Sequence, residues 1–219
     1  MKKKIVEFSK FALALIFSVS INNANAQETD YDFSDDKTGT TIFYNVTVDE
    51  FPLEVAVAFG SYEYNSYSGV VQVPDRVVKD GWGYSVTSIW ENAFAHSKDL
   101  TEIAFPENIV EIGDGAFMSC SGLKKITHFN NVESIGMIAF FNCSLLEEIT
   151  FGDKLSTIGD NAFNNCKSLS SITIKAVTPP NIMGSLGKTK ATIYVPADAV
   201  EAYKSAEGWN KMNIAPIAE

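Results

Sequence analysis

The sequence predicts a β-rich solenoid, which is a column of stacked coils that share one hydrophobic core. Two observations predict it: a period of 23 residues, and a strand-like segment at one fixed phase of that period. The period is shown by the phenylalanines Phe94, Phe117, Phe140 and Phe163, the isoleucines Ile89, Ile112, Ile135 and Ile158, and the leucines Leu100, Leu123, Leu146 and Leu169. A fixed period of this length is typical of proteins whose coils pack only on their neighbours.

The strand-like segment reads Leu100-x-x-Ile103-x-Phe105 in the first coil. Its apolar side chains are expected to face the core and the residues between them to face solvent. Coils stacked at ~4.8 Å would align these segments as a parallel sheet. The phenylalanine rings of successive coils would then lie within the ~4.5–7 Å that favours aromatic pairs.

A glycine column, Gly113, Gly136 and Gly159, follows the isoleucine column. We expect a sharp turn there, because glycine adopts backbone angles that other residues avoid. Trp90 takes this place in the first coil, which predicts a wider or more exposed bend.

Three cysteines also follow the period, at Cys120, Cys143 and Cys166, with Ser97 at the same phase of the first coil. A redox pair or a metal site is one interpretation, and a column of buried free thiols is the other. Side chains in register run parallel instead of converging, and disulfide geometry is demanding. The sequence therefore favours buried thiols that act as small hydrophobic groups.

The run Val-x-x-Ile-Gly-x-x-Ala-Phe-x-x-Cys-x-x-Leu-x-x-Ile resembles the BspA-like, or Treponema-type, leucine-rich repeat of bacterial surface proteins. The resemblance covers Val86 to Ile174, with a degenerate half-coil before it at Val71–Pro74. It implies a leucine-rich-repeat solenoid, an α/β superhelix, and adhesion to host matrix proteins or to other bacterial cells. The asparagine of the familiar repeat is present at Asn108 and Asn131 but not in the next two coils, so we expect no continuous asparagine ladder.

The first 26 residues have the pattern of a secretory signal peptide. Lysines precede an apolar run, Phe11 to Ile21, and Ala24-Asn25-Ala26 supplies small residues for cleavage. The run is too short to span a membrane, so we expect export to the periplasm, the cell surface or the medium. Cleavage before Gln27 would leave 219 − 26 = 193 residues with a net charge of −10 − 4 + 1 = −13, which disfavours a nucleic-acid partner.

Five segments are expected along the chain. The N-terminal cap is predicted as a β-hairpin, Ile42–Val46 with Leu53–Phe59, that covers the first edge of the solenoid. The C-terminal cap is predicted as a strand, Ile193–Val195, followed by a helix from about Pro196 to Glu207. The segments are the signal peptide (1–26), an acidic flexible lead-in (27–39), the N-terminal cap with the half-coil (40–85), the solenoid (86–178) and the C-terminal cap (179–219).

Catalytic and cofactor motifs are absent from the sequence, which predicts a protein without catalytic residues, cofactor or metal. The chain has two histidines, and neither accompanies a nucleophile motif. His128 falls at the inward phase that Phe105 occupies, so that either this histidine faces inward or the chain bulges to bury Phe129 instead. No phosphate loop, dinucleotide fingerprint or zinc spacing occurs.

What remains is the outer face of the parallel strands, where repeat proteins generally bind their partners. Its charge is striped along the stack: acidic, basic, acidic, then neutral. This pattern fits a protein or glycan ligand at a cell surface, and it equally fits a solvated sheet in a structural or assembly component of the bacterial envelope without a host ligand. The predicted binding residues are Glu102, Lys124, Lys125, Thr127, Glu147, Glu148, Thr150, Ser171 and Thr173.

Overall fold

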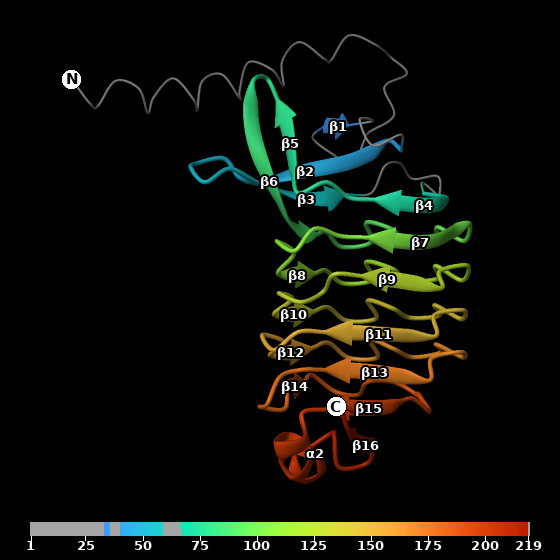
Figure 1. The fold of residues 1–219 in the computed structure, drawn as a ribbon. Helices are drawn as coiled ribbons and strands as arrows, with labels where there is room; N and C mark the ends of the chain where they lie inside the picture. The colour runs from blue at the N-terminus through green and yellow to red at the C-terminus, as the bar shows by residue number, and fades with distance from the viewer. Residues whose placement is uncertain (1–32, 36–39, 59–66, 219) are drawn as a thin grey trace, which may run out of the picture.

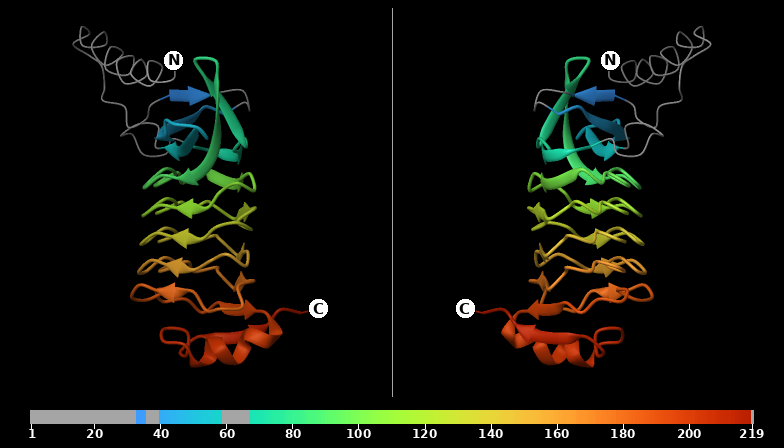
Figure 2. Two further views of the ribbon diagram at one scale, coloured as in Figure 1. Left: turned by 90° about the vertical axis from the view of Figure 1, so that its left-hand side faces the viewer. Right: turned by 90° about the vertical axis from the view of Figure 1, so that its right-hand side faces the viewer.

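The computed structural model describes residues 33–35, 40–58 and 67–218. The predicted signal peptide and most of the predicted lead-in lie outside these residues. Two stacks of short strands form one column, with the N-terminal strands at one end and helix α2 (Val200–Ser205) at the other (Figures 1 and 2).

The first stack is a nine-stranded sheet with the order β1-β2-β3-β6-β8-β10-β12-β14, in which β5 also pairs with β6. The coil strands of this stack are only two residues long and pair in parallel, so that Ile89, Ile112, Ile135 and Ile158 lie side by side. The strands are β1 (Phe33–Asp35), β2 (Ile42–Val48), β3 (Glu54–Ala58), β5 (Arg76–Lys79), β6 (Trp82–Ile89), β8 (Glu111–Ile112), β10 (Ser134–Ile135), β12 (Thr157–Ile158) and β14 (Asn181–Ile182).

The second stack holds the Leu-x-x-Ile segments in two parallel sheets, with the orders β4-β7-β9 and β11-β13-β15-β16. In Figure 1 its strands lie on the opposite side of the column from β8, β10 and β12. The strands are β4 (Gly69–Gln72), β7 (Leu100–Ala104), β9 (Lys125–Thr127), β11 (Glu148–Phe151), β13 (Ser171–Ile174), β15 (Thr192–Val195) and β16 (Asn213–Pro216).

A bulge at His128 separates the two sheets of this stack. His128 has a left-handed φ of 73°, its side chain is exposed, and Phe129 is buried in its place. The extra residue moves the inward position one place along the chain, and a single bridge between Phe129 and Phe151 joins β9 to β11. Of the two arrangements that the sequence allowed for His128, the structure therefore has the bulge.

Two columns of aromatic rings fill the space between the stacks. In the first column, Phe94, Phe117, Phe140 and Phe163 are buried, with successive ring centroids 5.1, 5.1 and 5.2 Å apart and nearly parallel. In the second, Phe105, Phe129 and Phe151 follow at 5.3 and 5.7 Å. Each coil thus buries its rings against its neighbours, which makes the core continuous along the column.

The glycine column serves close approach, so the special backbone angles predicted for it are wrong, although a turn does begin directly after each of these glycines. None of its members has a left-handed φ. A Cβ atom on Gly113 would lie 2.7 Å from the backbone nitrogen of Glu91, and one on Gly136 would lie 2.5 Å from that of Asp114. Successive coils approach so closely here that a side chain has no room.

The left-handed turns fall at two other phases of the coil. One phase holds Asn92, Gly115, Ile138 and Asn161, with φ between 49° and 60°, and the other holds His96, Ser119, Asn142 and Asn165, with φ between 60° and 64°. Glycine and asparagine tolerate this region, whereas a β-branched side chain does not. Ile138, at φ 49°, is therefore the strained member of its column.

We expect Ile138→Asn to raise the free energy of unfolding by about 1 kcal/mol, because asparagine relieves this strain. Urea denaturation of the variant and the wild type measures the difference. The reverse change, Asn161→Ile at the same phase, is the matched control and is expected to lower it by a similar amount. A stability unchanged or lowered in Ile138→Asn would contradict the assignment of strain.

At the N-terminal end, β2 and β3 form an antiparallel pair, and β3 pairs in parallel with β6 of the first coil. Residues 27–39 were predicted to lack regular structure, but Phe33–Asp35 form β1 and pair with the free edge of β2. Tyr67 ends the aromatic column: its ring lies 4.6 Å from that of Phe94, and its hydroxyl donates a hydrogen bond to the Ala58 carbonyl.

At the C-terminal end, the strand stacks continue beyond Thr178, where the sequence predicted that the solenoid ends. Strand β14 pairs with β12, β15 pairs with β13, and Leu186 is buried, with its carbonyl accepting a hydrogen bond from the Phe163 N–H. Pro179 and Pro180 stand between β13 and β14, where they interrupt no strand pairing.

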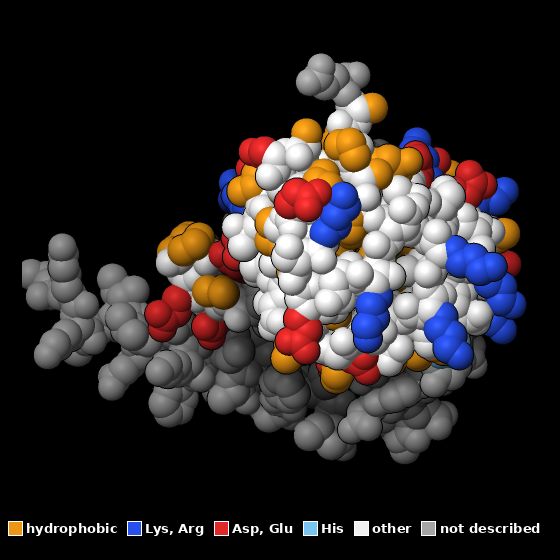
Figure 3. Space-filling view, turned by 90° about the horizontal axis from the view of Figure 1, so that it is seen from below, with side chains coloured by type: hydrophobic (Ala, Val, Ile, Leu, Met, Phe, Trp, Pro, Cys, Tyr) orange, Lys and Arg blue, Asp and Glu red, His pale blue; other side chains and the backbone are white. Residues whose placement is uncertain are grey.

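A short 3-10 turn, η1 (Ala197–Ala199), and α2 then close the column. Tyr203 and Trp209 are buried, and their polar atoms donate hydrogen bonds to the carbonyls of Ala176 and Pro180. Seen from this end, the described surface carries dispersed charges between small groups of hydrophobic side chains (Figure 3). Tyr203 and Trp209 belong to the same hydrophobic core as the coils, so the segment closes the C-terminal end of that core.

Candidate functional site

The predicted binding residues lie together on the second stack. Glu102 pairs in register with Lys125, Glu148 with Ser171, and Thr150 with Thr173. The alternating residues of these strands are buried isoleucines, so the nine predicted positions are all exposed or half-buried on the solvent side. The structure thus assembles the predicted set into one polar face, which we call the Leu-strand face.

Charge on the Leu-strand face is only partly neutralised within the chain. Lys125 Nζ lies 3.3 Å from Glu102 Oε1 in an exposed ion pair. The sheet break between β9 and β11 follows directly, and among the described residues Lys124, Glu147 and Glu148 have no ion-pair partner. These three charged groups are therefore available to another molecule.

Beyond the predicted residues, β15 and β16 extend this face. Thr192 lies beside Ser171, and Tyr194, which is half-buried, lies beside Thr173. The sequence placed Tyr194 in a cap instead of in the binding face. The spacing of Ile172 and Ile193, which is shorter than the repeat, concealed the match.

The cysteine column is a buried ladder. Each thiol donates a hydrogen bond to the phenylalanine carbonyl of the preceding coil, over distances of 2.9 Å from Cys120 to Phe94, 3.1 Å from Cys143 to Phe117 and 3.0 Å from Cys166 to Phe140. The three thiols are free, and burial raises the pKa of Cys120 and of Cys166 to about 12 and that of Cys143 well above its usual value. Redox exchange and metal binding both require the thiolate form, which burial disfavours. The cysteine column is therefore structural.

The described residues contain no group of three or more His, Cys, Asp or Glu placed to hold a metal ion. His128 is exposed, with Nδ1 3.2 Å from Thr127 Oγ1, and His96 is half-buried in a turn. Neither histidine adjoins a cysteine thiol that could ionise. Within the described part of the chain, no helix is both long enough and apolar enough to cross a membrane.

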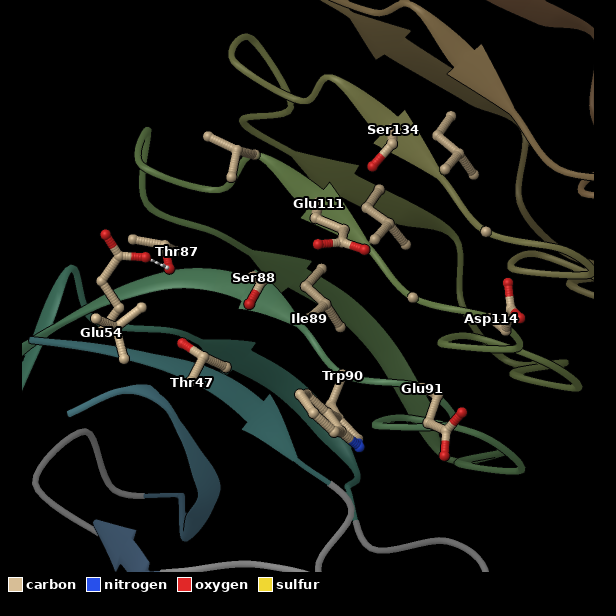
Figure 4. A pocket seen from close by; sticks show the side chains of 16 residues that line it. Thr47, Glu54, Thr87, Ser88, Ile89, Trp90, Glu91, Glu111, Asp114 and Ser134 are labelled. Atoms are coloured by element: carbon tan, nitrogen blue, oxygen red, sulfur yellow. Dashed lines mark hydrogen bonds between the residues drawn. The ribbon is translucent and has the colours of Figure 1, made fainter. Parts of the chain in front are cut away.

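A groove that the sequence did not predict lies on the first stack, with a volume of about 660 Å³. It forms where β2 meets the outward side of β6, β8 and β10 (Figure 4). Trp90 stands beside it and is 43% exposed, in agreement with the exposed bend expected there. The sequence signals were Trp90 at a glycine phase and the acidic pair Glu91 and Asp114, which are 23 residues apart.

Stacked coils of about 23 residues, each with a Leu-x-x-Ile strand and a buried phenylalanine, define this molecule as a leucine-rich-repeat protein. Residues 82–181 match, in six copies, the family described as BspA type Leucine rich repeat region. The predicted resemblance and the predicted solenoid are therefore confirmed over these residues. A comparison with curated protein sequences found no match.

Solved structures share this fold. The T. pallidum Leucine Rich Repeat protein matches with a TM-score of 0.60 at 22% identity, over 80% of this chain and 80% of that chain. A leucine-rich repeat protein from Bacteroides ovatus ATCC 8483 matches with a TM-score of 0.52 at 29% identity, over 75% of this chain and 47% of that one. The pneumococcal vaccine antigen PcpA gives a TM-score of 0.54 at 18% identity, over 78% and 52% of the two chains.

The family and the fold indicate a protein-interaction module, and such repeats are typically non-enzymatic.

Proposed function

We propose that this chain is an exported, non-catalytic module that binds a protein at a bacterial cell surface, and that it binds through the Leu-strand face. The observation that carries the proposal is the set of charges at Lys124, Glu147 and Glu148, which are exposed and have no ion-pair partner among the described residues. The adhesin role that the resemblance implies is part of this proposal.

The geometry of the face supports binding of a polar partner. Opposite charges alternate along the stack, so a complementary surface would gain orientation and register as well as attraction. Successive strands of the stack are spaced at ~4.8 Å. The rows of acidic and basic residues are therefore about as far apart as neighbouring side chains on a partner. The aromatic and thiol columns behind the face hold it rigid, which lowers the entropic cost of association.

Export rests on the N-terminal pattern of lysines, an apolar run and small residues, and on the surface location typical of the repeat family. Fractionation of the native cells with an antibody against the solenoid would test it. Detection of the full-length chain in the cytoplasm alone would contradict export.

The binding proposal is tested with the purified protein against an array of matrix proteins, cell-surface proteins and glycans. We expect a protein ligand whose binding falls about tenfold or more in Lys124→Glu with Lys125→Glu, because the change reverses the basic stripe. The matched control is Lys204→Glu with Lys211→Glu, which makes the same change of charge on the C-terminal cap. A protein that binds nothing on the array, or that binds equally well after both changes, would favour a structural component of the envelope.

A further inference from the structure

The groove on the first stack is lined by four carboxylates, and none of the described residues that line it is a lysine, arginine or histidine. Figure 4 shows Glu54 at one end of the groove, Glu91 and Asp114 at the other end, and Glu111 between them. The wall at the N-terminal side comes from Thr47 and Val48 of β2. The groove is therefore an acidic hollow on the side of the column opposite to the Leu-strand face.

Two of these carboxylates already have partners, and two do not. Thr87 Oγ1 donates a hydrogen bond to Glu54 at 3.0 Å, and the Met137 backbone N–H donates one to Asp114 at 2.7 Å. Within the described part of the chain, the carboxylates of Glu91 and Glu111 have neither a hydrogen bond nor an ion pair, and both residues are exposed.

Glu91 and Asp114 occupy the same phase of consecutive coils, which places like charges one above the other. Neighbouring strands lie only ~4.8 Å apart, and like charges at facing positions repel each other. A positive group held between them would remove this repulsion. The carboxylates of the groove thus favour a cation over a neutral ligand.

Trp90 gives this acidic end an aromatic wall. It stands at the phase where the next coils have Gly113 and Gly136, and its indole lies beside Glu91 in Figure 4. An aromatic face next to carboxylates binds an arginine or lysine side chain, because the ring attracts the cation and packs on its apolar stem.

We propose that the groove binds an extended cationic polypeptide segment, with one arginine or lysine side chain against Trp90 near the carboxylates of Glu91 and Asp114 and another near the carboxylate of Glu111. The segment belongs to a partner protein with basic residues at alternate positions, since these point to the same side of an extended chain. This site is separate from the Leu-strand face, so its test is independent of the proposed function.

The test uses the acetylated and amidated peptide Arg-Ser-Arg-Ser-Arg-Ser and titration calorimetry with the purified protein. We expect Glu91→Gln with Glu111→Gln to weaken its binding about tenfold, because two exposed charge contacts are lost. The matched control is Glu147→Gln with Glu148→Gln, which removes the same charge from the Leu-strand face and should change the affinity by less than about twofold. In NMR spectra of the protein, the indole N–H signal of Trp90, assigned with the variant Trp90→Gly, is expected to shift when the peptide is added.

Each outcome decides the proposal. The proposal is supported if only the Glu91 and Glu111 double variant binds the peptide more weakly. The Trp90 signal of the wild type should also shift, and the thermal melt of the double variant should be unchanged. Equal weakening in both double variants would show attraction by net charge only and would overturn it, as would absence of binding to the wild type. A neutral oligosaccharide such as cellohexaose that displaces the peptide and binds the double variant unchanged would overturn it in favour of a glycan site.

Discussion

Replacing Phe117 or Phe140 by alanine is expected to lower the free energy of unfolding by ~3–5 kcal/mol, the usual cost of emptying a buried aromatic site. Each ring is fully buried and stacks on a ring above it and a ring below it at 5.1–5.2 Å. Removal of one ring therefore leaves a cavity between two coils and breaks the contact that joins them. Urea denaturation followed by circular dichroism measures the loss.

Phe94→Ala is expected to cost about as much. Its ring is as buried as the others and contacts Tyr67 at 4.6 Å, Phe105 at 5.8 Å and Phe117 at 5.1 Å. Phe51→Ala is the control, because Phe51 is 77% exposed and its loss should cost less than about 1 kcal/mol. Equal destabilisation by Phe51→Ala and Phe117→Ala would contradict the role of the column.

The period of the sequence predicted most of this core, because stacked coils bring residues that are one period apart into contact. A residue and its equivalent 23 places later meet in space, so the columns of Ile89, Phe94 and Leu100 could be recognised without knowledge of the structure. The same logic placed Glu102 and Lys125 side by side, and with them the Leu-strand face.

Departures from the period were harder to predict, since each depends on local backbone freedom. The bulge at His128 needs one residue in a left-handed conformation, so the apolar pattern could offer it only as one of two arrangements. The last coil pairs Ile182 with Ile158 and Ile193 with Ile172, at spacings of 24 and 21 residues, and a period of 23 alone does not detect it. The groove at Trp90 arises where β2 meets the coils, so it depends on how a non-repeating segment packs against a repeating one.

The buried thiols predict a loss of stability in mild alkali. An unfolded cysteine ionises with a pKa near ~8.5, whereas burial raises the pKa of Cys120 and Cys166 to about 12 and that of Cys143 well above its usual value. Between pH ~8.5 and ~12, therefore, the unfolded chain releases protons that the folded chain keeps, and rising pH favours unfolding. At pH ~9.5 each thiol should lower the free energy of unfolding by about 1 kcal/mol, and the column by roughly a few kcal/mol.

Urea denaturation at pH ~7 and pH ~9.5 measures this loss, and a variant with serine at all three cysteine positions separates the thiols from other groups. Serine does not ionise in this range, and its hydroxyl can donate to the phenylalanine carbonyls that accept from the three thiols. We expect the serine variant to keep most of its stability at the higher pH. The serine variant could instead lose as much unfolding free energy at the higher pH as the wild type. The alkaline sensitivity would then originate outside the thiol column, and the folded state would not retain the thiol protons as proposed.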